Sequence, residues 1–299
     1  MKDRTHPTHM SYNLAPSIFF LYACQHMQSL LKKQIAIPQD HGSWVFILSP
    51  LLIGIFAGNI FTYATFNLIV AAMSAFMLRQ PMTIFIKALS GRRSRADLAS
   101  ARFWLLIYGI IAALALIGLI LEGFGYLLYL AIPAVPVFAW HLWLVSKHTE
   151  RKQAGIEIIA TGVLSLAAPA AYWIGIHRYD SAGWWLWFFA WMQSAASIVY
   201  AYLRLEQRGQ AEGKSRSEQW QIGRRALYYT SFNLAVSLLL GWGKLVPQLI
   251  FIPFLAQWLE ALWGITHPSI GWKPVRIGVR QFIVSTLWTT LFIVFWRIS

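Results

Sequence analysis

The chain has 299 residues, of which 58% are hydrophobic and 12% are charged, and its formal net charge is +14. A soluble domain carries about 25% charged residues, so this composition excludes an ordinary soluble protein. Repeated apolar runs of about 20 residues predict a multi-pass helical membrane protein, and their continuity argues against a β-barrel. The single cysteine, Cys24, excludes a disulfide framework and a multi-cysteine metal site.

Two units are expected along the chain. Residues 1–37 form a polar, basic segment that ends in an amphipathic helix over residues 17–33, which lies on the membrane surface with Lys32 and Lys33 among the lipid headgroups. Residues 38–299 form a single transmembrane helical domain.

The apolar runs predict an all-α bundle of about nine spans. The predicted spans cover residues 43–58, 60–78, 103–121, 125–146, 154–175, 183–203, 224–242, 246–265 and 279–297. The first two spans are separated only by Gly58 and Asn59, which predicts a tight helical hairpin. Proline predicts kinks, at Pro133 and Pro136 in the fourth span and at Pro169 in the fifth.

The distribution of basic residues predicts the orientation. With the N-terminus in the cytoplasm, alternate loops place 22 of the 25 Lys and Arg residues inside and leave Arg178, Lys244 and Arg297 outside. Cytoplasmic loops carry an excess of positive charge, so this count favours nine spans with the N-terminus inside and the C-terminus outside. The same rule accounts for the net charge of the chain without nucleic acid as a partner. Two of the inside loops, 79–102 and 204–225, are expected to be long and basic.

The ionisable residues within or beside the spans gather in the cytoplasmic half, which predicts a polar pocket open to the cytoplasm. Asp40 and His41 precede the first span, and they are candidates for a proton-transfer pair, with Glu157 as a further catalytic candidate. Arg79, Lys87 and Arg204 are candidates for binding an anionic headgroup.

Each candidate also has a structural interpretation. Asp40 can cap the first helix, and Glu157 is favoured near a helix N-terminus in any case. Arg79 and Arg204 close helices, where cations favour the C-terminal end of the dipole and reach the headgroups. Polar residues inside spans, Asn67, Gln193, Asn233 and Gln257, are expected to bond helices together.

Several sites are missing from the sequence. It has no glycine-rich phosphate loop, no histidine pair at helical spacing and no serine nucleophile motif. Its carboxylates are too sparse for a site that holds Mg²⁺ and a diphosphate. No metal site is therefore predicted, and the sequence leaves the cofactor open.

A heptapeptide before the first span resembles a known signature. Pro38-Gln39-Asp40-His41-Gly42-Ser43-Trp44 is similar to Pro-Arg-Glu-His-Gly-Ala-Trp of the YwiC-like membrane protein family, although Gln-Asp replaces the usual Arg-Glu. The resemblance also takes in Arg79-Gln80-Pro81, Pro169-Ala170-Ala171-Tyr172, Leu203-Arg204 and Arg276-Ile277-Gly278, and extends over most of the chain from about residue 35. It implies a multi-pass membrane protein and no particular reaction.

A looser similarity is to the UbiA-type prenyltransferases. They also have nine helices, a cytoplasmic N-terminus and long cytoplasmic loops after the second and sixth helices, but their Asp-rich Mg²⁺-diphosphate motifs are missing here. If the arrangement is shared, the metal-dependent chemistry is not expected to be.

Three functions are weighed. The leading hypothesis is a protein that binds or modifies an amphiphilic lipid or isoprenoid at the cytoplasm-facing pocket. The alternatives are a proton-coupled transporter of a small solute, with Glu157 and Glu260 as proton carriers, and an assembly factor that binds a protein through the two basic loops. Membrane lipids are the expected partners, in the cell membrane or, alternatively, in a thylakoid or other internal membrane.

Overall fold

The computed structural model describes residues 30–38, 41–147, 154–210 and 215–298, and in these ranges the chain is helical and has no strand. The first half contains α2 (Lys33–Ala36), η1 (His41–Trp44), α3 (Val45–Gly58), α4 (Tyr63–Leu89), α5 (Asp97–Leu121), η2 (Gly125–Leu130) and α6 (Ala131–Ser146). The second half contains α7 (Ala154–Leu164), α8 (Ala167–Gly175), α9 (Ala182–Arg208), α10 (Arg216–Trp242), η3 (Gln248–Ile250), α11 (Phe251–Thr266) and α12 (Pro274–Ile298).

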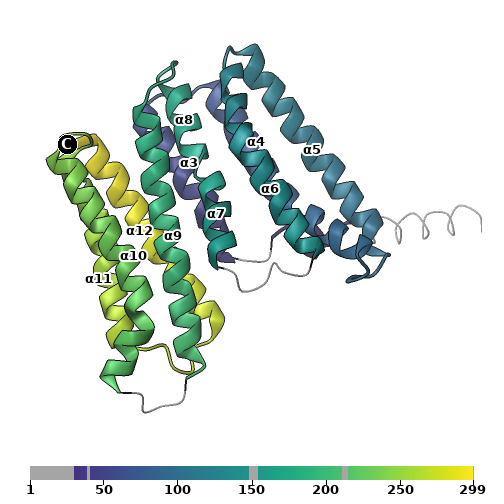
Figure 1. Ribbon diagram of the computed structural model, residues 1–299. Coiled ribbons are helices and arrows are strands. Elements are labelled where there is room, and N and C mark those ends of the chain that lie inside the picture. The colour runs from purple at the N-terminus through teal and green to yellow at the C-terminus, as the bar shows by residue number, and fades with distance from the viewer. Residues whose placement is uncertain (1–29, 39–40, 148–153, 211–214, 299) are drawn as a thin grey trace, which may run out of the picture.

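The helices form two groups that meet at α3 and α8. Figure 1 shows α4, α5 and α6 on one side and α9 to α12 on the other, with α3, α7 and α8 between them. One apolar core surrounds Leu51, Phe76 and Ile174, and a second surrounds Ile53, Phe189 and Phe254. Because α3 supplies Leu51 to the first core and Ile53 to the second, this helix joins the two groups.

Small residues let α3 approach α8 closely. A Cβ atom on Gly54 would lie 2.2 Å from the carbonyl oxygen of Ala168, and one on Gly58 would lie 2.9 Å from the Cα atom of Gly175. Glycine at these places allows two backbones to meet, as in many membrane helix pairs. The turn predicted at Gly58 and Asn59 is present, with Asn59 left-handed at φ 64°, but the main packing partner of α3 is α8 and not α4.

The predicted break at Pro169 is confirmed. The fifth predicted span is divided into α7 and α8 at Ser165 and Leu166. Proline has no N–H to donate to the carbonyl four residues earlier, which here belongs to Ser165. The Ser165 carbonyl instead accepts a hydrogen bond from the N–H of Ala168, three residues later, at 3.0 Å.

Six helical segments in the described part of the chain are long and apolar enough to cross a membrane. They are Tyr63–Leu89, Asp97–Leu121, Gly125–Ser146, Ala154–Gly175, Gln248–Thr266 and Pro274–Ile298. All nine predicted spans are helical, but Gly42–Gly58 is shorter, and α9 and α10 fall outside this set. The inner face of α9 explains its lower apolarity, because it carries buried Gln193, Arg204 and Gln207.

The prediction of two long basic loops is wrong. α4 continues to Leu89 and α5 begins at Asp97, so most of 79–102 is helical. α9 continues to Arg208, and α10 begins at Arg216 after a capping box in which Ser215 and Glu218 bond each other's backbone N–H. Arginine, lysine and glutamine are good helix formers, so a helix does not end where its apolar stretch ends.

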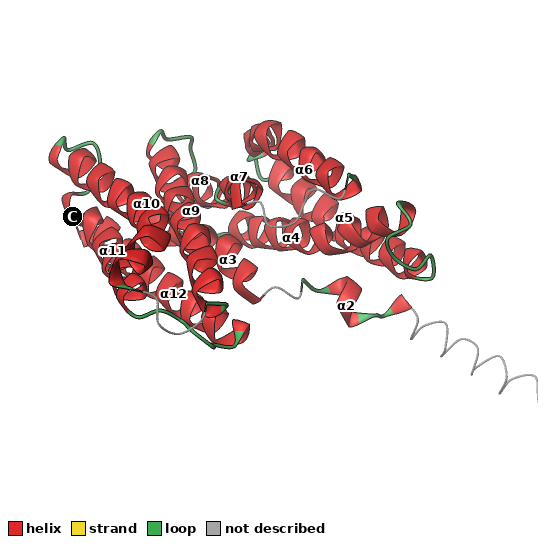
Figure 2. Ribbon diagram, turned by 60° about the horizontal axis from the view of Figure 1, so that its bottom comes forward, coloured by secondary structure: helices red, strands yellow, loops and turns green. Residues whose placement is uncertain are grey.

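Residues 30–38 lie against α4 and α5 (Figure 2). The Ser100 hydroxyl donates to the Leu30 carbonyl at 2.7 Å, and the Tyr108 hydroxyl donates to the Ala36 carbonyl at 3.0 Å. Between these two bonds the segment follows α5 for about 12 Å, at 1.5 Å per residue. Residues 30–38 therefore run alongside α5 past its charged N-terminal turns and into its apolar part. Residues 1–29, which include most of the predicted amphipathic helix, lie outside the described residues.

Candidate functional site

The predicted signature before the first span is described in part. Asp40 and the side chain of His41 lie outside the described residues. The ring of Trp44 packs edge-on against Phe76 at 5.3 Å between centroids. Phe76 lies at the middle of α4, about 20 Å from either end at 1.5 Å per residue. Trp44, the last residue of the motif, thus lies beside the middle of α4.

Two of the predicted basic residues are on α4. Arg79 follows Phe76 by three positions and shares its face of the helix, so it lies near the level of Trp44. Lys87 lies in the last turn of α4, two turns further along, and both side chains are partly buried. The third predicted basic residue, Arg204, is on α9 in the other helix group, so the structure does not join the three in one site.

Glu157 lies in the first turn of α7 and is exposed. Its carboxylate accepts a hydrogen bond from the Tyr202 hydroxyl of α9 at 2.8 Å. Tyr202 and Arg204 are two positions apart on α9, and side chains at that spacing leave a helix in nearly opposite directions. Glu157 therefore lies on the Tyr202 side of α9, and the Arg204 side chain leaves α9 on the other side.

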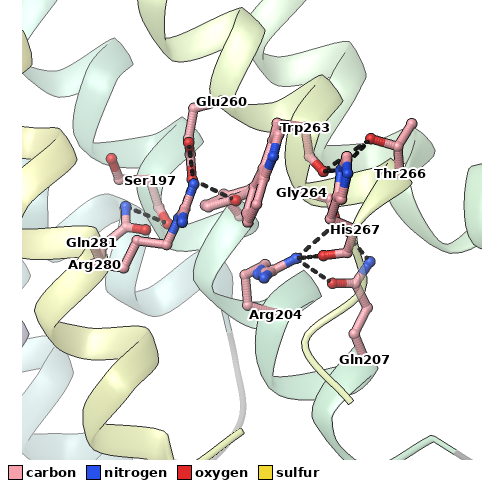
Figure 3. A network of polar contacts seen from close by, with 11 residues as sticks. Ser197, Arg204, Gln207, Glu260, Trp263, Gly264, Thr266, His267, Arg280 and Gln281 are labelled. Atoms are coloured by element: carbon pink, nitrogen blue, oxygen red, sulfur yellow. Dashed lines mark hydrogen bonds and ion pairs between the residues drawn. The ribbon is translucent and has the colours of Figure 1, made fainter.

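Arg204 is the most deeply buried of the predicted site residues that the structure describes, with 1% of its surface exposed. Its Nη1 donates to the Gly264 carbonyl at 2.8 Å, to the His267 carbonyl at 2.7 Å and to Gln207 Oε1 at 2.9 Å (Figure 3). Gly264 and His267 are at the C-terminal end of α11, where the free carbonyls and the helix dipole favour a cation. One edge of the guanidinium is thereby fixed by neutral acceptors.

Aromatic rings surround the same guanidinium. The Cζ atom of Arg204 lies 5.0 Å from the ring centroid of Trp272, 5.5 Å from that of Trp263 and 5.9 Å from that of Tyr200. These distances are in the range of cation–π attraction. Nε and Nη2 of Arg204 are buried, and they have no hydrogen-bond partner in the described part of the chain. Within the described part of the chain, the hydrogen bonds and ring contacts of this buried cation are thus with uncharged groups.

An ion pair lies on the other side of Trp263. Arg280 donates from Nε and Nη2 to the two carboxylate oxygens of Glu260, at 2.7 and 2.9 Å, and its Cζ atom lies 3.7 Å from the Trp263 centroid. The Tyr200 hydroxyl donates to the same carboxylate at 2.8 Å. Both oxygens of Glu260 are therefore engaged by Arg280, and Glu260 interacts with Arg204 only at longer range, without an ion pair between them.

Exposed cations border the site. Arg276 lies with its Cζ atom 4.0 Å from the Trp272 centroid, Arg208 Nε donates to the Trp272 carbonyl at 2.8 Å, and Lys273 adjoins the same tryptophan. We call this set the basic–aromatic cluster, and its members are Tyr200, Arg204, Arg208, Glu260, Trp263, Trp272, Lys273, Arg276 and Arg280. It holds five cations and one carboxylate, and such an excess of positive charge favours an anionic ligand.

Beyond the cluster, polar side chains bond the helices together, as predicted. Gln257 Nε2 donates to the Gln193 carbonyl at 3.1 Å, Asn233 Nδ2 to the Met192 carbonyl at 2.8 Å, and Asn67 Nδ2 to Glu122 Oε1 at 2.8 Å. Among the described residues no group of three or more His, Cys, Asp or Glu side chains is placed to hold a metal ion.

The sequence analysis identified Arg204 but missed most of its surroundings. Trp272, Arg276 and Arg280 follow one another at intervals of four residues; Trp272 lies two residues before α12, and Arg276 and Arg280 lie on one side of its start. That spacing is present in the sequence, but there Arg276 and Arg280 count among the charges that orient the helices, and Arg276 also belongs to the family resemblance. The contacts of Arg204 with α11 join residues about 60 positions apart, and no local pattern indicates them.

The geometry can be compared with known proteins. Residues 37–172 match the family model of the YwiC-like proteins. The match supports the predicted YwiC-like resemblance from the Asp40-His41 motif to Tyr172, which is somewhat less than half of the chain. The α9–α12 bundle with the basic–aromatic cluster lies beyond the YwiC-like match. No curated protein and no solved structure matches the chain, so the similarity to UbiA-type prenyltransferases stays a prediction.

Proposed function

We propose that this chain is a YwiC-like multi-pass membrane protein over its whole length, and that its basic–aromatic cluster binds the anionic headgroup of an amphiphilic lipid or isoprenoid. The observation that carries the proposal is the buried guanidinium of Arg204, which lies among aromatic rings while the only carboxylate of the cluster is engaged by Arg280. A buried charge is costly unless a counter-charge or hydrogen bonds compensate it.

The position of the cluster favours an amphiphile over a free solute. The cluster lies where α11 ends and α12 begins, and both helices belong to apolar segments long enough to cross a membrane. Val275 and Val279 of α12 are 75% and 53% exposed beside Arg276. Apolar side chains next to exposed cations suit a ligand that has both an acyl or prenyl chain and a charged head.

The proposed headgroup site modifies the predicted one. Arg204 keeps its predicted role, with Arg208, Lys273 and Arg276 as the accompanying cations in place of Arg79 and Lys87. The catalytic roles of Asp40, His41 and Glu157 remain predictions. The transporter alternative gains no support from Glu260, because both oxygens of this carboxylate are engaged by Arg280.

Replacing Arg276 by Gln tests the proposal. The full-length chain is purified, and the lipids that accompany it are compared by mass spectrometry with those of the source membrane. The wild-type protein is expected to enrich an anionic amphiphile, and Arg276→Gln is expected to reduce this enrichment about fivefold, since one partly exposed cation contributes about 1 kcal/mol.

Arg102→Gln is the matched control. Arg102 is also exposed and lies over an aromatic ring, Phe85, at 5.7 Å, but it belongs to α5 in the other helix group. It should leave the enrichment unchanged. A wild-type protein whose lipids match the bulk membrane would contradict the proposal, as would equal losses in the two variants.

The proposal retains nine spans with a cytoplasmic N-terminus, which places the cluster on the cytoplasmic side. Single cysteines in a Cys24→Ser background test this arrangement, at the exposed positions Ser90, Ser217 and Ser181. A membrane-impermeant thiol reagent added to whole cells should label Ser181→Cys alone, and should label the other two only after the membrane is opened. Labelling of Ser90→Cys and Ser217→Cys on opposite faces would be inconsistent with this topology.

A further inference from the structure

We propose that the Nε–Nη2 edge of Arg204 is an oxyanion-binding site that takes two oxygens of one phosphate group. This inference rests on the proposed function. It assigns the buried part of the headgroup site to the Nε and Nη2 atoms of Arg204. It applies equally to a phosphate in a lipid headgroup and to a free phosphate ion.

The distribution of bonds on Arg204 supports the assignment. A guanidinium has five N–H donors, and all three hydrogen bonds that the structure gives Arg204 leave from Nη1. The three N–H groups on Nε and Nη2 are buried and have no acceptor among the described residues. Nε and Nη2 form the side of the fork that matches two oxygens of a carboxylate or phosphate.

The surroundings hold this edge in place. Nη1 is fixed to the end of α11, and the Ser269 hydroxyl donates to the Arg204 carbonyl at 2.7 Å, so the side chain and its backbone are both anchored. In Figure 3 the Nη1 side faces Gly264, His267 and Gln207, and the remaining nitrogens face away from them. An anchored guanidinium loses little conformational entropy when it binds an anion, which favours affinity.

A structural role alone does not account for the free edge. The bonds from Nη1 explain how Arg204 ties α9 to the end of α11, and a single amine would serve that purpose. Leaving charged donors buried without acceptors costs free energy that an apolar residue of similar size would avoid. Arg276, which lies over Trp272, adds positive charge to the same cluster, whereas the charge of Arg280 is paired with Glu260.

The test measures the Tm of the full-length protein in neutral detergent, with and without each of two anionic probes. Inorganic phosphate is added against chloride at equal ionic strength, and mixed micelles of phosphatidylglycerol are added against phosphatidylcholine. A ligand that binds the folded state alone raises the Tm, and at a fixed ligand concentration the rise is larger for tighter binding. We expect at least one anionic probe to raise the Tm of the wild-type protein, and the pair of probes shows whether the source is a lipid or a free ion.

Arg204→Lys keeps the positive charge and loses the fork, so we expect about tenfold weaker anion binding. The control Arg102→Lys should respond as the wild type does. Gln207→Glu is the second variant, since it places a carboxylate next to Nη1 while Arg204 stays, and it should abolish the response even if Arg204→Lys does not fold.

The inference is overturned if neither anion raises the wild-type Tm, or if Arg204→Lys or Gln207→Glu responds fully. Retained lipid enrichment that Arg276→Gln lowers, together with no effect of Arg204→Lys, would remove this inference and leave the proposed function. A Tm response to phosphate that depends on Arg204, without any lipid enrichment, would keep the anion site and remove the proposed lipid function.

Discussion

Glu260→Gln is expected to destabilise the protein by about 2–4 kcal/mol, between the values for exposed ion pairs and for broken buried ones. The carboxylate accepts two bonds from Arg280 and one from Tyr200, and 15% of its side chain is exposed. Its loss would leave Arg280 and Arg204 near the same tryptophan, Trp263, without the one carboxylate of the cluster. Thermal unfolding in detergent measures the change.

Asp97→Asn is the control for this prediction. Asp97 also pairs with two cations, Lys32 and Arg93, each at 2.7 Å, but their side chains are 40% and 36% exposed. Water can solvate these cations when the carboxylate is removed, and it can also solvate Arg280, whose side chain is 33% exposed. The larger loss expected for Glu260→Gln therefore rests on the buried Arg204 in the same cluster, whereas Asp97→Asn is expected to cost about 1 kcal/mol or less. The double variant Glu260→Gln with Arg280→Gln should recover part of the stability. If Glu260→Gln and Asp97→Asn lowered the free energy of unfolding equally, repulsion among the cations of the basic–aromatic cluster would not contribute to the loss.

Gly54→Ala is expected to cost about 1–3 kcal/mol, the usual penalty for forcing an extra carbon into a packed interior. The new Cβ atom would lie 2.2 Å from the Ala168 carbonyl oxygen and 2.7 Å from the Ala171 Cβ atom. Neither α3 nor α8 can move away easily, since Gly58 and Gly175 are in close contact one turn further along. Because α3 joins the two helix groups, a lower yield of folded protein should accompany the lower Tm.

Gly109→Ala separates this effect from helix propensity. Gly109 is inside α5, and a Cβ atom there would meet nothing within 4 Å. Alanine favours a helix over glycine by about 1 kcal/mol, so this variant should be as stable as the wild type or more so. If Gly54→Ala behaved in the same way, α3 and α8 could not be packed as the structure has them.

The sequence predicted the helices well because apolar runs of membrane length are a strong signal. The break at Pro169 also follows from one residue, since proline removes a specific backbone bond. The ends of α4, α9 and α10 were missed, because the charged residues that end an apolar run are themselves good helix formers. The close packing of α3 on α8 depends on Gly54 and Gly175, which lie 121 positions apart in the sequence.

Of the predicted site residues, Arg204 lies in the basic–aromatic cluster, and the arrangement around it is not predictable from the sequence. Arg204 was selected as an ionisable group near the end of a span, which is a local property. Its placement against Trp263 and Trp272, and apart from Arg79 and Lys87, follows from how α9 packs against α11 and α12. Glu260 was selected as a proton carrier because the sequence does not show that Arg280 lies opposite it.

The central claim is that the basic–aromatic cluster holds an anionic amphiphile, and native mass spectrometry of the intact protein tests it most directly. The wild-type chain and the control Arg102→Gln should each carry one bound anionic lipid that survives mild activation, and Arg276→Gln should carry much less of it. Equal retention of that lipid by all three proteins, or no bound lipid on the wild-type chain, would contradict the account.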